Sequence, residues 1–298
     1  MGTAVRVEIW QESPELARHA SDAVFAEIRR IEQVMSPLIA GSELSQINQY
    51  SAQRPVVVSD ELFQLLKTSK HISDISDGIF DISFSSVGYL YDFRAGKKPS
   101  EQQIEQLIDK IDYTAILLDD KNHSVSFKHD GMKLDLGGIA KGYAVDRGIA
   151  ILRSRGIEHA IVTAGGDSRV LGDHRGRDWM VGIQAPRNRS AVATAVPLSN
   201  AAISTSGDYE RFFVEDGIRF HHIINPKTGD SARKLQSASV VGPEAVVTDA
   251  LSTTVFILGI ERGLALIEGL PEYEAILIDQ HSKMHYSSGF QPAGSGNR

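Results

Sequence analysis

The chain has 298 residues, of which 42% are hydrophobic and 23% are charged, as is typical of a globular protein. The formal net charge of -7 and the lack of a Lys/Arg run argue against a general nucleic-acid binder. Because it has no cysteine, disulfides, thiolate zinc sites and a cysteine nucleophile are excluded.

The N-terminal residues "MGTAVRVEIWQESPE" lack the basic end and apolar core of a signal peptide. No stretch reaches the roughly 18 consecutive apolar residues of a membrane-spanning helix. Two alternatives stay open: the protein is not exported, or its leader is missing from this sequence.

The first part of the chain predicts one strand and several helices. Alternating residues 5–10 predict the strand, and helices are expected at about 14–35, after residue 42, at about 60–73 and from residue 101 to 111. A capping serine precedes each helix, and the last serine forms a capping box with Gln103. These serines are Ser13, Ser42, Ser59 and Ser100.

Between these helices, the aromatic segment 76–93 is irregular and predicts loop lining. Further on, "AILLDDKNHSVSF" predicts two strands about an Asp-Lys-Asn turn, and "HAIVTAGG" predicts another strand. The stretches "SRVLG" and "WMVGIQAP" predict a hairpin about the polar segment "DHRGRD". Strands and tight turns follow over residues 201–229.

The C-terminal part predicts a helix over residues 248–258 that ends at Gly259, a further helix and the strand "YEAILID". Hairpins mixed with helix crossovers favour an α+β or mixed α/β fold over a doubly wound parallel sheet. We expect a single domain over residues 1–290, built from two packed lobes, and a disordered tail over residues 291–298.

The stretch "KLDLGGIAKGYAVDRG" (133–148) has the outline of a phosphate loop, although its spacing matches neither the Walker nor the dinucleotide pattern. One interpretation is a structural strand-to-helix turn. In the other, Gly137 and Gly138 bring backbone close to a ligand, the helix N-terminus presents N–H groups to phosphate, and Lys141 adds a charge.

Two further groups of residues suggest chemistry. Asp249 and Thr253 are four apart on a helix, and their oxygens suit Mg²⁺, although a solvent-facing Asp beside a packed Thr has the same spacing. His221 and His222 point to opposite sides of a strand, so a shared zinc ion is disfavoured. One of them is a candidate general base or phosphate contact, and a half-buried structural histidine is the alternative.

Taken in order, "MSPLIAGSELSQIN", "SDGIFDIS", "KLDLGGIAKGYAVDRG", "AGGD", "STSGDYERFF", "HHIINPKTG" and "VTDALSTTVFILG" cover nearly the whole chain. This ordered set resembles the ApbE family, the FAD:protein FMN transferases. The resemblance implies a T-fold-like, two-lobed α+β architecture with mixed, largely antiparallel sheets flanked by helices. It also implies a Mg²⁺-dependent transfer of FMN from FAD to a Thr or Ser hydroxyl of an acceptor protein, with release of AMP.

The resemblance also assigns roles to residues. His222 and Asp249 match catalytic positions, and His222 is the one suspected of a role in transfer. The matched metal ligands are the carbonyl of Gly138 and the side chains of Asp249 and Thr253, with Ser252 adjacent. The matched FAD contacts are Met35, Leu38, Ile79, Phe80, Asp81, Asp135, Lys141 and Ile224.

The chain departs from the family pattern at three positions. Leu38 stands where relatives usually have a tyrosine that stacks on the flavin, which changes FAD affinity or orientation unless Tyr89 or Tyr91 substitutes. Ser83 stands where a threonine is usual, and Asn225 where an aspartate is usual; both changes keep the turn or the hydroxyl.

The resemblance implies acceptors that are flavin-carrying subunits of membrane redox complexes, such as the Na⁺-pumping NADH:quinone reductase or Rnf-type complexes. It implies a place in the periplasm or on the outer face of the inner membrane, and without a leader the cytoplasm stays an alternative. Two other functions also stay open: an FAD diphosphatase that releases FMN and AMP, and a degenerate FAD-binding protein.

Overall fold

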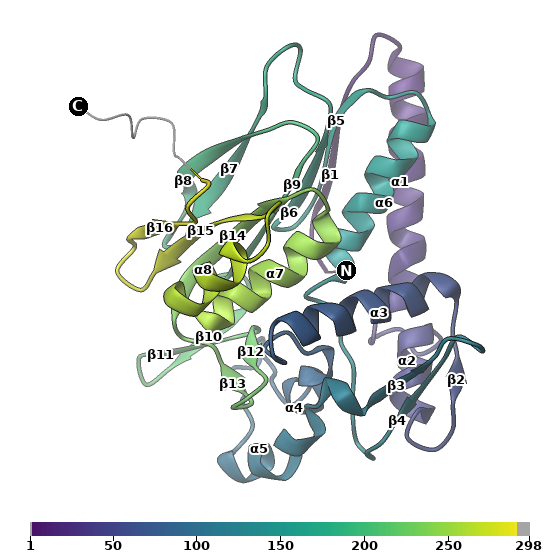
Figure 1. Cartoon of the computed structure of the whole chain (residues 1–298), viewed down its shortest axis with the longest axis vertical. Coiled ribbons are helices and arrows are strands. Elements are labelled where there is room, and N and C mark those ends of the chain that lie inside the picture. Colours follow the sequence, from purple (N-terminus) through teal and green to yellow (C-terminus); the bar gives the residue numbers. More distant parts are fainter. Residues whose placement is uncertain (1, 291–298) are drawn as a thin grey trace.

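A seven-stranded antiparallel sheet forms one half of the molecule, with the strand order β1-β5-β6-β9-β14-β15-β16 (Figure 1). The structure is a computed structural model that describes residues 2–290. The expected tail, 291–298, lies outside the described residues. The strands of this sheet are β1 (Val5–Trp10), β5 (His159–Ala164), β6 (Asp167–Leu171), β9 (Ala202–Gly207), β14 (Leu235–Gly242), β15 (Glu274–Asp279) and β16 (Met284–Tyr286).

Four helices cover one face of this sheet: α1 (Pro14–Met35), α6 (Ala140–Ser154), α7 (Ala245–Leu258) and α8 (Ile260–Glu268). Strand alternation explains the arrangement, because Ala160 and Val162 of β5 join the core beneath α1 and α6, whereas Ile161 packs on the opposite side. Helix α7 ends at Gly259, whose φ of 80° favours glycine.

The hairpin of β7 (Trp179–Ala185) and β8 (Asn188–Leu198) covers the other face, where Trp179 and Ile183 are buried. The predicted pairing of "SRVLG" with "WMVGIQAP" is therefore wrong. The first stretch is β6, which pairs with β5 and β9 inside the main sheet, while the second pairs with β8. Strand β6 pairs with β5 and β9 instead of β7, and the sequence around β6 contains no information about which distant strand will pair with it.

The other half of the molecule combines the helix α3 with several short elements (Figure 1). They are α2 (Glu43–Tyr50), β2 (Val56–Val57), α3 (Asp60–Ile75), the 3₁₀ turn η1 (Ile82–Phe84), α4 (Ser85–Gly88), α5 (Glu101–Leu107), the turns η2 (Ile108–Lys110) and η3 (Tyr113–Ala115), β3 (Ile116–Asp119) and β4 (Ser124–Phe127). Two short hairpins join the halves: β10 (Phe212–Glu215) with β11 (Ile218–His221), and β12 (Ile224–Asn225) with β13 (Asp230–Ser231).

The α+β class is confirmed, and every pair of strands is antiparallel in the part that the structure describes. All of the capping serines accept the expected N-terminal hydrogen bond, and both bonds of the capping box form. Segment 76–93 is less irregular than expected, since it holds η1 and α4. The single domain of two lobes stays a prediction. No helix within residues 2–290 has the length and apolar character needed to cross a membrane.

Candidate active site

A large cavity lies where the two halves meet and has a volume of about 1400 Å³. Small-molecule sites usually measure roughly 300–1,000 Å³, so this one has room for a dinucleotide and part of a second reactant. Its wall comes from the end of α1, the loop before η1, the turn before α6, α7, the loop after β9 and one strand of the covering hairpin, β7.

A charged cluster lies behind the cavity wall at Lys141. The Lys141 ammonium contacts Asp249 Oδ1 and Oδ2 at 2.8 and 2.9 Å and forms an ion pair with Asp167 Oδ2 at 2.9 Å. The side chains of Asp167 and Asp249 are 1% and 3% exposed, so water screens these charges poorly. Two buried carboxylates thus face one ammonium, and the cluster carries a net negative charge when both are ionised.

Protonation in this cluster follows from burial and charge. Burial, followed by the negative charge of Asp249, raises the pKa of Asp167 to about 7. Burial of Lys141 alone would lower its pKa, but Asp167 and Asp249 together raise it above the usual lysine range. The ammonium therefore stays charged at neutral pH.

The helix geometry that holds Asp249 depends on Gly142. A Cβ at this position would lie 2.0 Å from the Ala245 carbonyl oxygen, so only glycine lets α6 and α7 approach this closely. In this arrangement the Gly142 N–H donates to Asp249 Oδ2 at 3.0 Å. The sequence interpretation of a helix N-terminus with N–H groups free for phosphate is therefore wrong for Gly142, because a carboxylate of the same chain accepts that bond.

Next to the charged cluster, hydroxyl groups converge on the start of α6. The half-buried Thr253 lines the cavity, and its Oγ1 contacts Ser206 Oγ at 3.1 Å. A Cβ on Gly138 would lie 3.4 Å from Thr253 Oγ1, so the Gly138 backbone lies against this hydroxyl. Ser252 is buried behind it, donates to the Asp249 carbonyl at 2.9 Å and contacts Ser206 at 2.9 Å.

These groups fit a hard divalent cation. The Asp249 carboxylate, the Thr253 hydroxyl and the Gly138 carbonyl are oxygen donors, and the negative charge of the cluster with Asp167 ionised favours a cation. Across residues 2–290, no three His, Cys, Asp or Glu side chains gather as a metal-binding group, so backbone, hydroxyl or substrate oxygens must complete the shell of any such ion.

The two other predicted carboxylates mainly hold loops. Asp81 Oδ1 accepts from the Ser83 N–H and hydroxyl at 2.8 and 2.6 Å, and Oδ2 accepts from Tyr113 N–H at 3.0 Å. Asp135 Oδ1 accepts from Gly137 N–H at 2.6 Å. Burial raises the pKa of both carboxyls. The hydroxyl of Ser83 thus links Asp81 to the backbone N–H of Asp112.

The adjacent histidines have different surroundings, as alternation along a strand predicted. The buried His221 lies edge-on to Phe256, and its Nε2 contacts the Ala232 carbonyl at 2.5 Å. His222 instead lines the cavity, and its buried Nδ1 has no hydrogen-bond partner among the described residues. Burial, with the nearby positive charge of Arg211 next in importance, lowers the pKa of His222 to about 3. Its ring is therefore neutral.

The apolar residues predicted to contact a flavin all line the cavity: Met35, Leu38, Ile79, Phe80 and Ile224. Leu38 differs from the others in being 92% exposed, whereas Met35 is buried. Of its two possible substitutes, Tyr91 is turned inward and donates to the Gly229 carbonyl at 3.0 Å. Tyr89 is half exposed on the cavity wall, with the Lys133 ammonium over its ring at 4.2 Å.

Three residues at this site were not among the sequence predictions: Asp167, Ser206 and Arg211. Asp167 belongs to the quoted "AGGD" and the other two to "STSGDYERFF", so the motifs were recognised without a role for these side chains. Asp146 was also missed; it accepts from Ala245 N–H and Val246 N–H at 2.9 and 2.8 Å and so fixes the start of α7.

Comparison with known proteins agrees with this architecture. The FAD:protein FMN transferase of Treponema pallidum is 31% identical over 97% of this chain and 85% of its own length. The crystal structure of the ApbE protein from Thermotoga maritima has a TM-score of 0.89 and 33% identity, over 97% of this chain and 95% of that one. The flavin transferase ApbE from Vibrio cholerae has a TM-score of 0.84 and 26% identity, with the same coverage.

The family pattern itself spans almost the whole described chain. The ApbE family matches residues 1–277, which include the charged cluster, the hydroxyl groups and both histidines. By this match and by the curated relatives, the chain belongs to the ApbE family.

Proposed function

We propose that this protein is an FAD:protein FMN transferase, which moves FMN from FAD to a Thr or Ser hydroxyl of an acceptor protein and releases AMP. The observation that carries the proposal is one large cavity lined by Gly138, Lys141, Thr253 and the neutral His222, with the Asp249 carboxylate buried against Lys141. The names of the relatives support the same reaction.

The cavity residues suit the two ends of FAD differently. Apolar side chains near the end of α1 and the loop before η1 provide a surface for the planar flavin. The proposed Mg²⁺, held by Asp249, Thr253 and Gly138, would supply the positive charge that offsets the diphosphate. Lys141 holds the Asp249 carboxylate in place through both of its oxygens, and Asp167 pairs with the same ammonium.

Transfer then needs one bond to form and one to break. The acceptor oxygen attacks the phosphorus of the FMN half, the bond from this phosphorus to the bridging diphosphate oxygen breaks, and AMP departs with that oxygen. The hydroxyl proton passes to His222, whose neutral ring lines the cavity. Asp167 has a pKa nearer to 7 but is not part of the cavity wall, so it serves as a support for Lys141.

A labelling experiment tests the function. The protein is incubated with FAD, Mg²⁺ and a candidate acceptor domain, and the acceptor is examined for flavin fluorescence on a denaturing gel. An acceptor whose target Thr or Ser is changed to Ala is the matched control. Labelling of the unchanged acceptor alone supports transfer; FMN and AMP without labelling identify a diphosphatase; intact, tightly held FAD identifies a binding protein.

The acceptors proposed for this test are flavin-carrying subunits of membrane redox complexes of the Na⁺-pumping NADH:quinone reductase or Rnf type. Such acceptors would place the reaction in the periplasm or at the outer face of the inner membrane. The family resemblance supports both proposals, and fractionation of cells that express the full-length protein tests the second.

A further inference from the structure

One cation on the cavity wall has no partner in the folded protein. Within residues 2–290, the Arg211 side chain lines the cavity, is exposed and makes no hydrogen bond, ion pair or ring contact. The other Lys and Arg side chains of the wall are all engaged: Arg6 pairs with Glu8, Lys133 lies over Tyr89, and Lys141 pairs with Asp167 and Asp249.

Arg211 lies beside the proposed reaction centre. The His222 N–H donates to the Arg211 carbonyl at 3.2 Å, which ties the two residues together through the backbone. The guanidinium is also close enough for its charge to favour the ionised form of Asp135. It forms no ion pair with Asp135, whose Oδ1 instead accepts the Gly137 N–H. A fixed positive charge therefore faces the cavity with its donors unused.

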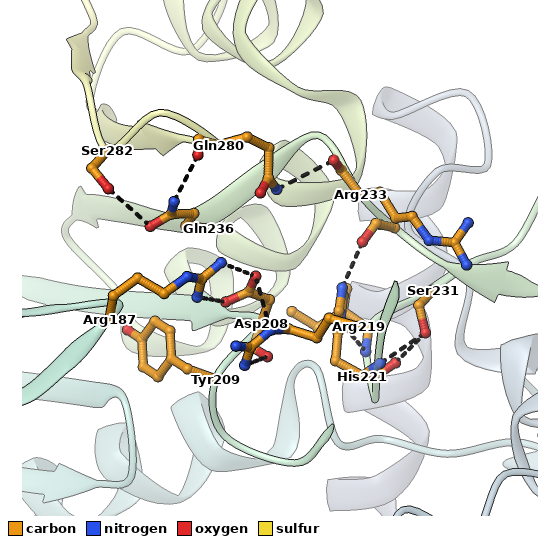
Figure 2. A network of polar contacts seen from close by, with 12 residues as sticks. Arg187, Asp208, Tyr209, Arg219, His221, Ser231, Arg233, Gln236, Gln280 and Ser282 are labelled. Atoms are coloured by element: carbon orange, nitrogen blue, oxygen red, sulfur yellow. Dashed lines mark hydrogen bonds and ion pairs between the residues drawn. The ribbon is translucent and has the colours of Figure 1, made fainter. Parts of the chain in front are cut away.

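The loop that carries Arg211 is anchored by a buried network (Figure 2). The carboxylate of Asp208, which is 4% exposed, accepts from both Nη1 and Nη2 of Arg187 at 2.6 and 2.7 Å. Arg219 Nη1 donates to the Asp208 carbonyl at 3.4 Å. The next residue, Tyr209, is buried and packs its ring against Gly207. The backbone just before Arg211 is therefore fixed from the covering hairpin and from β11.

An arginine that only faced solvent would not require a loop held by a buried ion pair. A buried carboxylate bound by a bidentate arginine costs desolvation, and it stabilises a particular geometry when all of its oxygens are used. Here that geometry directs the Arg211 backbone beside His222. A planar guanidinium on such a fixed loop suits bidentate recognition of phosphate oxygens.

We propose that Arg211 binds the diphosphate of FAD, and that Asp208 is a positioning residue that holds the loop carrying it. This inference rests on the proposed use of FAD and adds to it a phosphate contact beside His222. The remaining alternative, that Arg211 pairs with a carboxylate of the acceptor protein, gives a different result in the experiment below.

The test compares equilibrium binding of FAD with that of riboflavin, which has no phosphate. Both are titrated by flavin fluorescence, without acceptor, into the wild type, Arg211→Ala, Arg211→Lys and the control Arg153→Ala. Arg153 is exposed near the end of α6 and is not part of the cavity wall. We expect Arg211→Ala to weaken FAD binding by about 10- to 100-fold, as for loss of a charge-assisted hydrogen bond, and to leave riboflavin binding unchanged.

Arg211→Lys should restore part of the FAD affinity, and Arg153→Ala should affect neither ligand. Unchanged FAD binding in Arg211→Ala, or equal weakening of FAD and riboflavin, would overturn the proposal. If FAD binding is unchanged and only the KM for the acceptor rises, Arg211 contacts the acceptor instead. A wild type that binds FAD but labels no acceptor refutes the proposed function while leaving the FAD contact testable.

A double-mutant cycle tests the positioning role of Asp208. Asp208→Asn should weaken FAD binding in the wild-type background and have no further effect in the Arg211→Ala background, because both changes then remove the same contact. If the two effects multiply, Asp208 contributes only general stability and the positioning role is refuted.

Discussion

Asp249→Asn tests most directly whether Asp249 binds a metal ion or only packs against Lys141 and α6. In the folded protein the Asp249 carboxylate accepts two contacts from Lys141 and one from the Gly142 N–H. The asparagine keeps the shape and one acceptor oxygen, so the backbone contact can persist. The charge is lost, and with it the only carboxylate in the proposed donor set.

The cost in stability should be modest, because Lys141 keeps its ion pair with Asp167 at 2.9 Å. Removing one partner of a buried pair costs about 3–5 kcal/mol when the other charge is left alone. Here the ammonium is not left alone, and the repulsion between Asp167 and Asp249 disappears. We therefore expect a loss of about 1–3 kcal/mol in the free energy of unfolding, typical of a hydrogen bond to a charged group.

The effect on the reaction should be much larger. Changes in residues that merely orient metal ligands weaken binding or activity by about 10- to 100-fold, so loss of the carboxylate itself should exceed about 100-fold. Transfer is measured as flavin fluorescence on the acceptor over a series of Mg²⁺ concentrations, and stability by urea denaturation. The Asp120→Asn variant is the matched control, because Asp120 also contacts a lysine, Lys67, at 2.7 Å, but on the surface.

A folded Asp249→Asn protein that transfers FMN at the wild-type rate, with an unchanged Mg²⁺ requirement, would refute the metal assignment. The urea denaturation curve distinguishes a variant that is inactive because it is unfolded from one that is folded but inactive. Asp120→Asn should change neither measurement by more than twofold.

Other predictions follow from the same geometry. His222 has a pKa of about 3 in the folded protein against a usual 6.5, so between these pH values the unfolded chain binds more protons and the folded protein should lose stability as pH drops below about 6.5. In thermal unfolding, His222→Gln should lose less stability over this pH range than the wild type. An equal loss in both proteins would refute the buried neutral ring. Leu38→Tyr should tighten FAD binding by about 2- to 12-fold through stacking, whereas unchanged fluorescence titrations would place the flavin elsewhere. Gly142→Ala should lower the free energy of unfolding, measured by urea denaturation, by about 1–3 kcal/mol or more, because the new Cβ pushes α6 away from the Ala245 carbonyl. Gly41→Ala is the control and should leave it unchanged, because a Cβ on Gly41 would meet no atom within 4 Å.

Much of the fold could be predicted because its signals are local. A capping serine, a proline or an alternating apolar run acts within a few residues, so the helix starts that follow a capping serine and most strands were placed correctly. Helix α7, which no capping side chain precedes, begins at Ala245, three residues before the expected start. The pairing of β6 could not be found in this way, because β6 has partners on both sides that lie elsewhere in the sequence. A turn-rich polar segment between two strands favours a hairpin only when neither strand has a better partner.

In the site, too, local relations could be predicted from the sequence and long-range contacts could not. Asp249 and Thr253 share a helix face, so spacing alone brings them together, whereas Asp167 lies on β6 and meets Lys141 only through the packing of α6 on the sheet. The partnership of Lys141 with two carboxylates therefore could not be predicted from "KLDLGGIAKGYAVDRG". That stretch predicted a lysine for phosphate; in the folded chain its ammonium is held by carboxylates.

The arrangement of Lys141 also explains how one carboxylate could serve a lysine and a metal ion. If Asp249 were its only partner, a cation that bound Asp249 would repel a buried ammonium left without compensation. Asp167 removes this difficulty, because it lies 2.9 Å from Lys141 Nζ and keeps that charge neutralised. When both carboxylates are ionised, they carry one negative charge more than Lys141 offsets. In the proposed metal site, Asp167 would thus leave Asp249 available to a cation without itself coordinating it.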